Sequence, residues 1–392
     1  MKIAITCPAS LPATQFGGIL FLGIDLAREL SKKGNEVVIY TTDLDFSNNA
    51  FTFNRDLPRL EKINGFTIRR SHVIFRIKLF FVNPTIYNQI KRDKPNIIHS
   101  IGIRSFQALV SALISKFNNI PLIISDQGGL FTHPDYGKAG LKSILYRLQE
   151  PMIKFIIKQA KKIIVANEYE RTIFSRYCKN SKLVLVRNGV DFKYLQTTSF
   201  DFKSKHKING KMLLFLGRFN KVKGIDLLLQ SFSEICKRPK YDDVTLVIMG
   251  ADFGYQEQMF REIKRLKLGN RIKVVQNPSR EEVIAAYHSC EFAVLPSRWE
   301  MSPLTPLEVF SCKKPVISTN VHGIPYVVKD GKNGILVQPE NSKALTNAIT
   351  TLLDDNGMRV KFGNNAFSLV KDECNSKIMT EKIFEIYTSV IN

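Results

Sequence analysis

The stretch LPSRWEMSPLTPLEVFSCKKPVIST (residues 295–319) is typical of a strand end, a short proline-stiffened loop, a helix start and a second strand. One apolar run, 291–297, leads into the loop, and another, 314–319, follows the helix. Apolar strands without polar alternation indicate a parallel sheet that is covered on both faces. The stretch therefore predicts an α/β fold.

The same alternation of strand and helix runs through both halves of the chain. Between most of the apolar runs lie segments of helical period, such as 19–33, which stops at Gly34. A length of 392 residues suits two domains. We therefore expect two Rossmann-like, doubly wound α/β domains that face each other across a cleft. The expected strands are 2–6, 36–42, 96–100, 121–125, 161–167 and 182–188 in the first half, and 212–219, 244–250, 271–276, 291–297, 314–319 and 334–339 in the second.

Composition shifts place the expected domain boundaries. We assign 1–195 to an N-terminal domain, the polar and weakly periodic 196–210 to a linker, and 211–375 to a C-terminal domain. A helix-like segment, 376–392, is expected to cross back to the first domain. Ligands of doubly wound folds bind at the carboxyl ends of the strands, which puts the expected site there.

The composition, 44% hydrophobic and 23% charged, is that of an ordinary globular protein. No apolar run is long enough for a signal peptide or a spanning helix. The six cysteines form no CxxC pair, which favours reduced thiols, a cytoplasmic location and no zinc site.

Net charge is +22 and unevenly spread along the chain. Residues 1–200 hold 29 Lys and Arg against 14 Asp and Glu, whereas the rest hold 28 against 21. A basic first half suits nucleic acid, an anionic membrane surface or a phosphorylated substrate, and charge alone does not separate these.

Two strand-to-helix turns are candidate anion sites. Gly17 and Gly18 open the first long helix, where glycines let a backbone approach an anion and the helix N-terminus supplies free N–H groups; a plain turn explains them equally well. Arg218 and Lys223 flank the second turn and can converge on a diphosphate. A solvated charge pair is the alternative there, and the P-loop pattern is absent.

The quoted stretch itself holds two glutamates with different explanations. Thr305, Pro306 and Glu308 fit a capping box, with Thr as N-cap and Glu three residues later. Capping does not explain Glu300, which sits in the loop beside Trp299. A rigid loop that holds several backbone N–H groups toward one point makes an anion-stabilising site.

At these residues the chain resembles the retaining glycosyltransferases of family 4, which have the GT-B fold of two Rossmann-like domains. The specific match is Glu-x7-Glu set between Leu-Pro-Ser and Lys-Pro-Val-Ile-Ser-Thr. The resemblance covers nearly the whole chain. Further matching segments are QFGGIL, VRNGVD, LLFLGRFNKVKGIDLLLQSF and HGIPYVVKDGKNGILV.

The resemblance implies a donor site for a nucleotide diphosphate sugar. Arg218 and Lys223 would hold the diphosphate, Glu300 would lie by the transferred sugar, and Glu308 would bind the ribose hydroxyls. The backbone N–H groups would face the sugar and phosphate, and Gly18, next to Gly17, would close over the diphosphate from the other domain. The loop residues implied are Met301, Ser302, Leu304 and Thr305. Glu300, Arg218 and Lys223 are the expected catalytic residues.

The N-terminal domain would carry the acceptor, and here the chain departs from the family pattern. His99 is not followed by the second histidine that members often carry, and Asp126 stands where many have His-Gly. His99, Asp126 and His133 are therefore acceptor-side candidates. A packed histidine is the alternative for His99.

No Asp-x-Asp motif or metal-ligand cluster is visible, so we expect no metal and no cofactor, with two cations balancing the departing diphosphate. Basic segments with interleaved apolar residues, 69–84 and 140–162, suggest a peripheral membrane contact and a lipid-linked acceptor. A core-facing helix with a solvated basic face is the alternative for 140–162.

Other protein classes fit less well. A nucleotide-sugar epimerase of the same fold would need no acceptor, and a non-catalytic scaffold would have no reason to keep Arg218, Lys223, Glu300 and Glu308. Nothing resembles a helix-turn-helix, zinc-finger or RNP motif, so nucleic acid is not an expected partner. No GxGxxG follows either first strand, which disfavours a dehydrogenase.

Overall fold

The computed structural model describes residues 1–46, 52–126, 130–134 and 141–391, apart from the side chains of residues 141–143 and 145. These residues form two compact α/β units. The first comprises Met1–Gly189 together with the last helix, α15 (Ser376–Ile391), and the second is Val190–Asn375. The stretch 196–210, expected as a linker, belongs to the second unit and contains α8 (Phe202–His206), which packs against α11 (Arg280–Ser289).

The first unit is built on a sheet whose described strands are parallel except β5 at one edge. Its central strands β1, β2, β9 and β10 are buried almost throughout, which explains their uninterrupted apolar sequence. In spatial order the strands are β12 (Leu183–Leu185), β11 (Lys162–Val165), β10 (Leu122–Ser125), β9 (Ile97–Ile101), β1 (Lys2–Thr6), β2 (Glu36–Thr42), β6 (Phe66–Ser71) and β5 (Leu60–Ile63).

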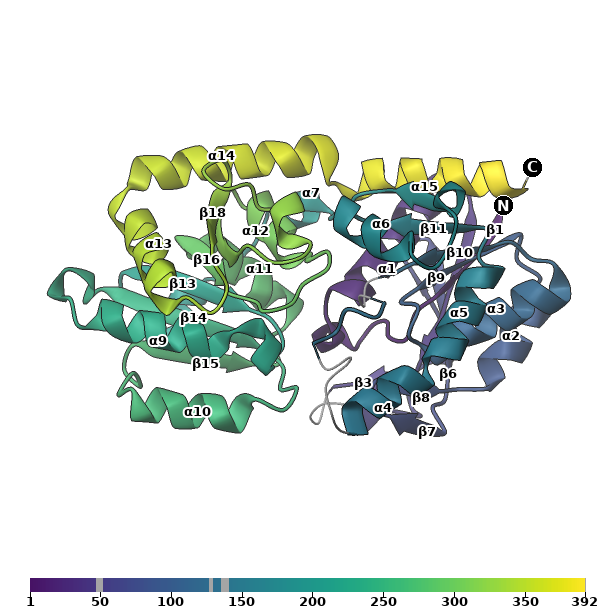
Figure 1. Ribbon diagram of the computed structural model, residues 1–392, viewed down its shortest axis with the longest axis horizontal. Helices are drawn as coiled ribbons and strands as arrows, with labels where there is room; N and C mark the ends of the chain where they lie inside the picture. Colours follow the sequence, from purple (N-terminus) through teal and green to yellow (C-terminus); the bar gives the residue numbers. More distant parts are fainter. Residues whose placement is uncertain (47–51, 127–129, 135–140, 392) are drawn as a thin grey trace. The chain divides into compact units, whose positions relative to one another are not determined.

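Helices and two small strand pairs complete the first unit (Figure 1). Helix α15 returns to this unit and packs along α1. The helices are α1 (Gly18–Lys32), α2 (Thr85–Asp93), α3 (Phe106–Asn118), α4 (Leu141–Leu148), α5 (Glu150–Gln159) and α6 (Glu168–Phe174). The strand pairs are β3 (Leu44–Asp45) with β4 (Thr52–Phe53), and β7 (Phe75–Ile77) with β8 (Phe80–Val82).

The sequence prediction of one helix over 140–162 was wrong. The chain instead forms α4 and α5, and Pro151 stands in the first turn of α5. Proline lacks the N–H that a continuing helix needs, so it begins a new helix at this point. The apolar face of α5, with Ile153, Ile156 and Ile157, is buried and packs against α3.

The second unit has a parallel sheet with helices on both faces (Figure 1). Helices α9 (Ile225–Cys236), α10 (Gln256–Arg265) and α13 (Ser342–Asp354) pack together, and α12 (Thr305–Ser311) packs with α14 (Asn356–Glu373) and α7 (Phe192–Leu195). The strand order is β15 (Ile272–Gln276), β14 (Val244–Gly250), β13 (Lys211–Leu216), β16 (Phe292–Leu295), β17 (Val316–Thr319) and β18 (Gly334–Val337).

Each sheet has a point where the chain reverses its direction of winding. It lies between β1 and β9 in the first unit and between β13 and β16 in the second. Loops at the carboxyl ends of such strands diverge and leave room for a ligand. The fold therefore marks one ligand edge in each unit.

Candidate active site

The loop after β13 carries Arg218 and Lys223 at the ligand edge of the second unit. Lys223 ends a short 3₁₀ turn, Lys221–Lys223, and Gly224 then caps α9 with a φ of 70°. A Cβ on Gly224 would lie 2.0 Å from the carbonyl oxygen of Pro296 in the loop after β16. Only glycine allows this backbone approach, so the two loops are pressed together.

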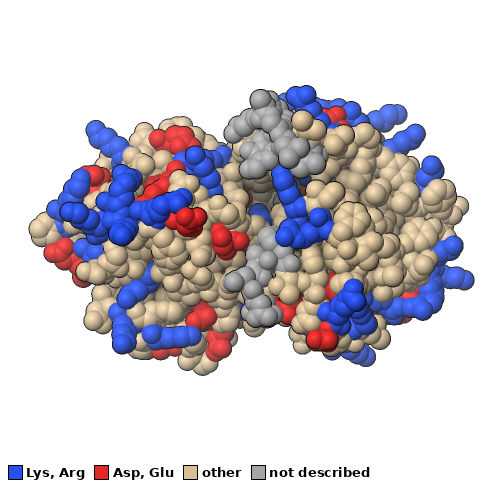
Figure 2. Space-filling model, turned by 90° about the horizontal axis from the view of Figure 1, so that it is seen from below, with Lys and Arg blue, Asp and Glu red and all other residues tan. Residues whose placement is uncertain are grey.

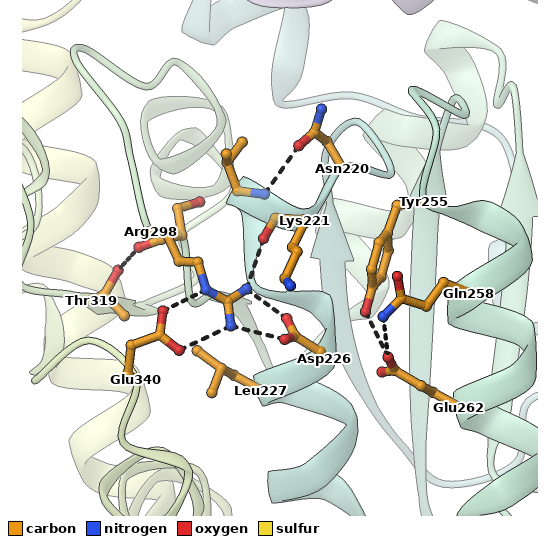
Figure 3. Close-up of polar contacts among 12 residues, drawn as sticks. Asn220, Lys221, Asp226, Leu227, Tyr255, Gln258, Glu262, Arg298, Thr319 and Glu340 are labelled. Carbon is orange, nitrogen blue, oxygen red and sulfur yellow. Dashed lines mark hydrogen bonds and ion pairs between the residues drawn. The ribbon is translucent and has the colours of Figure 1, made fainter. Parts of the chain in front are cut away.

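Arg298 fastens these two loops to each other (Figure 3). Its backbone N–H donates to the Val222 carbonyl at 2.7 Å, and its Nη1 donates to the Lys221 carbonyl at 2.7 Å. The guanidinium also donates two bonds to Asp226 on α9, at 2.6 and 2.8 Å, and pairs with Glu340. Forked Arg–carboxylate pairs are strong and directional. Arg298 therefore holds the loop that carries Glu300 against the loop that carries Lys223.

Lys223 and Glu300, one from each loop, meet directly. Lys223 Nζ donates to a Glu300 carboxylate oxygen, and Ser297 Oγ lies 3.3 Å from the same oxygen. The two side chains are 17 and 18% exposed, so the pair is screened from water but remains open on one side. The structure thus brings together two of the residues expected to catalyse the reaction.

Glu308 does not form the capping box predicted from sequence. Helix α12 begins at Thr305 after Leu304, which makes no side-chain cap. The buried Glu308 carboxylate instead accepts hydrogen bonds from Arg280 Nη2 and the Tyr287 hydroxyl, both at 2.6 Å. Charge-assisted bonds of this kind outcompete a backbone cap.

The Tyr287 hydroxyl that bonds Glu308 stays protonated. Complete burial, with the nearby Glu308 charge, holds the pKa of Tyr287 well above its ordinary value. It therefore acts as a permanent donor that orients the Glu308 carboxylate.

The remaining donor-side residues lie in their expected loops. The Arg218 guanidinium stacks on Phe253, with 5.0 Å from its central carbon to the ring centroid. Met301 and Leu304 are buried, whereas Ser302 and Thr305 are half-buried. The loop between Glu300 and α12 is therefore anchored by its apolar side chains.

Gly17 and Gly18 belong to the first unit, in the segment after β1. Gly17 has a φ of 100° and caps α1, and Gly18 is its first residue. The adjoining Ile19 approaches the loop after β9, because a Cβ on Gly102 would lie 2.8 Å from its Cδ1 atom. The glycine pair therefore sits at the ligand edge of its own unit.

The three acceptor-side candidates have different surroundings. His99 is 1% exposed, and its ring nitrogens bond the Tyr387 hydroxyl at 2.6 Å and the Ser125 hydroxyl at 2.7 Å. Burial lowers the pKa of His99 to about 3, so the ring is neutral and serves packing. Asp126 is buried and accepts from the Leu130 N–H at 2.9 Å. The His133 ring packs on Tyr146, with centroids 5.0 Å apart.

Sequence reasoning missed several residues that hold the donor loops. Arg298 stands inside the quoted stretch, two residues before Glu300, but its partners Asp226 and Glu340 are distant in sequence. Arg280 and Tyr287 are seven residues apart on α11, two turns along one face. This spacing is the sequence signal that both side chains could bind the same group, here the Glu308 carboxylate.

Two features are missing from the described residues. Among them, no helix is long and apolar enough to cross a membrane. No group of three or more His, Cys, Asp or Glu side chains in the same described ranges could hold a metal ion.

The chain is similar to known glycosyltransferases along most of its length. Two family models match the chain, Glycosyltransferase Family 4 over residues 16–194 and Glycosyl transferases group 1 over residues 196–369. A similar protein is the D-inositol 3-phosphate glycosyltransferase of Corynebacterium diphtheriae, 26% identical over 385 residues, which cover 93% of this chain and 89% of that protein.

Solved structures of similar fold cover nearly the whole chain. Sucrose-phosphate synthase from Thermosynechococcus elongatus superimposes with a TM-score of 0.81 at 20% identity, over 99% of this chain and 98% of that one. Anabaena Alr3699/HepE in complex with UDP-glucose gives 0.77 at 18% identity, over 99% and 100%. The chain belongs to the family 4 type of glycosyltransferases and has their GT-B fold.

Proposed function

We infer that the chain transfers a sugar from a nucleotide diphosphate sugar to an acceptor, with retention at the anomeric carbon. The observation that carries this inference is the Lys223–Glu300 pair, held at the ligand edge of the second unit by loops from β13 and β16. A cation for a diphosphate and a carboxylate beside the sugar are the groups that the reaction needs there.

The donor roles follow from the chemistry of each side chain. Arg218 and Lys223 hold the diphosphate, and Glu308, oriented by Arg280 and Tyr287, accepts from ribose hydroxyls. Glu300 lies beside the sugar. UDP is the first nucleotide to test, because the similar Anabaena protein was solved with UDP-glucose.

Charge stabilisation is the main catalytic task in this proposal. The bond between the anomeric carbon and the diphosphate breaks, a bond to the acceptor oxygen forms on the same face, and the acceptor proton leaves with the diphosphate. Negative charge builds on the diphosphate, where preorganised cations stabilise it most. Arg218 and Lys223 supply that charge in place of a metal ion.

Donor hydrolysis in water tests retention without knowledge of the acceptor. We would incubate the protein with UDP-glucose, GDP-mannose and ADP-glucose and follow the first-formed free sugar by NMR. Slow release of the α anomer from one donor is the expected result. Initial release of the β anomer would contradict retention, and turnover of no donor would contradict the proposal as a whole.

A lipid-linked acceptor reached from a membrane surface is the second part of the proposal. Around the β7–β8 hairpin, Ile74, Phe75 and Ile77 are 61, 53 and 50% exposed, and Arg76 and Lys78 alternate with them. Helix α4 exposes Ile144 and Leu148. Both elements lie at the lower edge of the first unit in Figure 1. Figure 2 views that edge, where blue Lys and Arg groups border broad uncharged areas.

Vesicle flotation tests the membrane contact. Exposed apolar side chains flanked by cations favour an anionic bilayer surface. Flotation with phosphatidylglycerol vesicles should exceed flotation with phosphatidylcholine vesicles at physiological salt. The Phe75→Ser, Ile77→Ser double variant should reduce it, whereas Phe117→Ser, which alters an exposed side chain on α3, should not. Equal flotation of both variants would remove the hairpin from the proposal.

A further inference from the structure

Arg104 stands at the ligand edge of the first unit. It lies between β9 and α3, on one side of the point where the sheet reverses its winding. The same loop contains Gly102, which approaches Ile19 at the start of α1. Loops in this position of a doubly wound sheet receive ligands, so the location of Arg104 is that of a binding residue.

The Arg104 guanidinium is shielded and incompletely bonded. Its Nε and Nη2 atoms are closed to solvent, and neither has a hydrogen-bond partner in the described part of the chain. The guanidinium carbon lies 4.3 Å from the centroid of the Tyr146 ring, on α4. Burial lowers the pKa of Arg104 from its ordinary value, which reflects the cost of enclosing this charge.

Arg70, a fully buried arginine of the same unit, shows what the fold provides when such a side chain is structural. Its guanidinium donates to the carbonyl oxygens of Leu11 and Pro58 and pairs with Glu61. Buried polar groups are nearly always bonded, and an enclosed unpaired charge is costly. Asp126 lies near enough to act on the charge of Arg104, but the described residues supply no hydrogen-bond acceptor for its Nε and Nη2 groups, which leaves them for a ligand.

We propose that Arg104 binds a phosphate group of the acceptor substrate. The planar guanidinium presents two adjacent N–H groups, Nε and Nη2, which match two oxygens of a phosphate. Tyr146 covers the face of the guanidinium from α4, and α4 exposes Ile144 and Leu148 on its surface. A lipid phosphate has this combination of charge beside hydrocarbon, and a soluble phosphorylated acceptor shares only the charge.

This proposal rests on the proposed function, because only a transferase has an acceptor substrate. The binding site itself does not depend on the donor site, since Arg104 and Lys223 belong to different units. The two can therefore fail separately. Trp299, the one tryptophan of the chain, follows Arg298 beside Glu300 and gives an independent fluorescence signal for the donor loops.

Calorimetric titration of the full chain, with UDP held at saturation, tests the site. The probes are inorganic phosphate and dihexanoyl phosphatidate, a lipid phosphate short enough to stay monomeric. Arg104→Gln should weaken both by about 10- to 100-fold, as loss of a charged hydrogen-bond pair predicts. Arg104→Lys should fall between, and Arg92→Gln, an exposed arginine on α2, should match the wild type.

Each outcome decides the proposal. Tighter binding of the phosphatidate than of phosphate supports a lipid acceptor, and equal binding supports a soluble phosphorylated one. Binding of both probes unchanged in Arg104→Gln, or binding of neither while UDP still alters Trp299 fluorescence, overturns the site. If UDP does not bind while phosphate binding still depends on Arg104, the donor proposal is overturned and the Arg104 site is not. A melting temperature of Arg104→Gln below that of the wild type, with no change in phosphate binding, would assign Arg104 a structural role.

Discussion

The half-buried cations at the ligand edges of the two units have different partners. In the second unit Lys223 pairs with Glu300, Arg280 with Glu308, and Arg298 with Asp226 and Glu340. In the first unit, by contrast, two N–H groups of Arg104 find no partner among the residues that the structure describes. Each of the three cations of the second unit has a carboxylate partner within that unit, whereas Arg104 has no ion pair among the described residues.

We interpret this difference as two roles: the second unit holds its donor loops in place before the ligand arrives, and the first unit recognises a ligand. Paired charges hold loops in place before the donor arrives, which lets a site stabilise charge without rearranging. An unpaired buried charge gains most from a ligand that supplies the missing partner. We therefore assign the donor reaction to the second unit and propose that the first unit recognises the acceptor.

The largest expected effect comes from breaking the Lys223–Glu300 pair. Lys223→Ala removes the cation nearest the expected diphosphate and should lower kcat for donor hydrolysis by roughly 10²- to 10³-fold, as removal of one charge-stabilising donor does. Lys221→Ala, an exposed side chain in the same 3₁₀ turn, should retain the wild-type rate. Near-normal turnover of a folded Lys223→Ala protein would contradict the catalytic role of Lys223 and of the site in the second unit.

Arg298→Met should destabilise the second unit next most strongly. It leaves Asp226 and Glu340 without their shared partner and unfastens the two donor loops. Loss of one member of a half-buried ion pair predicts a decrease of about 2 to 3 kcal/mol in the free energy of unfolding, less than for a fully buried pair because Glu340 is exposed to solvent. Urea denaturation measures this decrease. Arg298→Lys, which keeps the charge but not the fork, should recover part of kcat. If kcat in Arg298→Lys is no higher than in Arg298→Met, Arg298 has a purely structural role.

Gly224→Ala tests the close approach of the donor loops. The added Cβ would meet the Pro296 carbonyl at 2.0 Å, so the free energy of unfolding should fall by about 2 kcal/mol. Gly254→Ala is the matched control, because Gly254 also has a positive φ, 90°, but open space around it; its cost should be about 1 kcal/mol. Equal losses would show that backbone conformation alone, and not the contact, matters at Gly224.

His99 gives the smallest expected effect, and its two hydrogen bonds show that the first unit can satisfy a buried polar group. Because its pKa is about 3 in the folded protein and about 6.5 in an unfolded chain, the unfolded chain binds more protons between those pH values. Stability should thus decrease as pH falls, by about 1 kcal/mol from pH 6.5 to 5.5. His99→Gln should flatten that part of the stability profile measured by urea denaturation; an unchanged slope would assign it to other groups.

The positions of the expected strands and the Glu-x7-Glu stretch were readable from sequence because they depend on local periodicity and fixed spacing, but β5 and β6 of the first sheet were not predicted. The capping box at Glu308 was mispredicted because Arg280 and Tyr287, distant in sequence, bind that carboxylate in the fold. The prediction of a single helix over 140–162 was wrong because a new helix begins at Pro151. The effect of a proline is local, so this break was predictable from sequence. Arg104 carried no motif, since burial without a partner is a property of the packed structure alone.

The central claim is that the ligand edge of the second unit binds a nucleoside diphosphate. The most direct test is calorimetric titration of the protein with UDP, GDP and ADP, with and without magnesium. The account predicts tight binding of one diphosphate in both conditions, lost in Arg218→Ala and in Glu308→Ala. Binding of none, or equal binding by both variants, would contradict it.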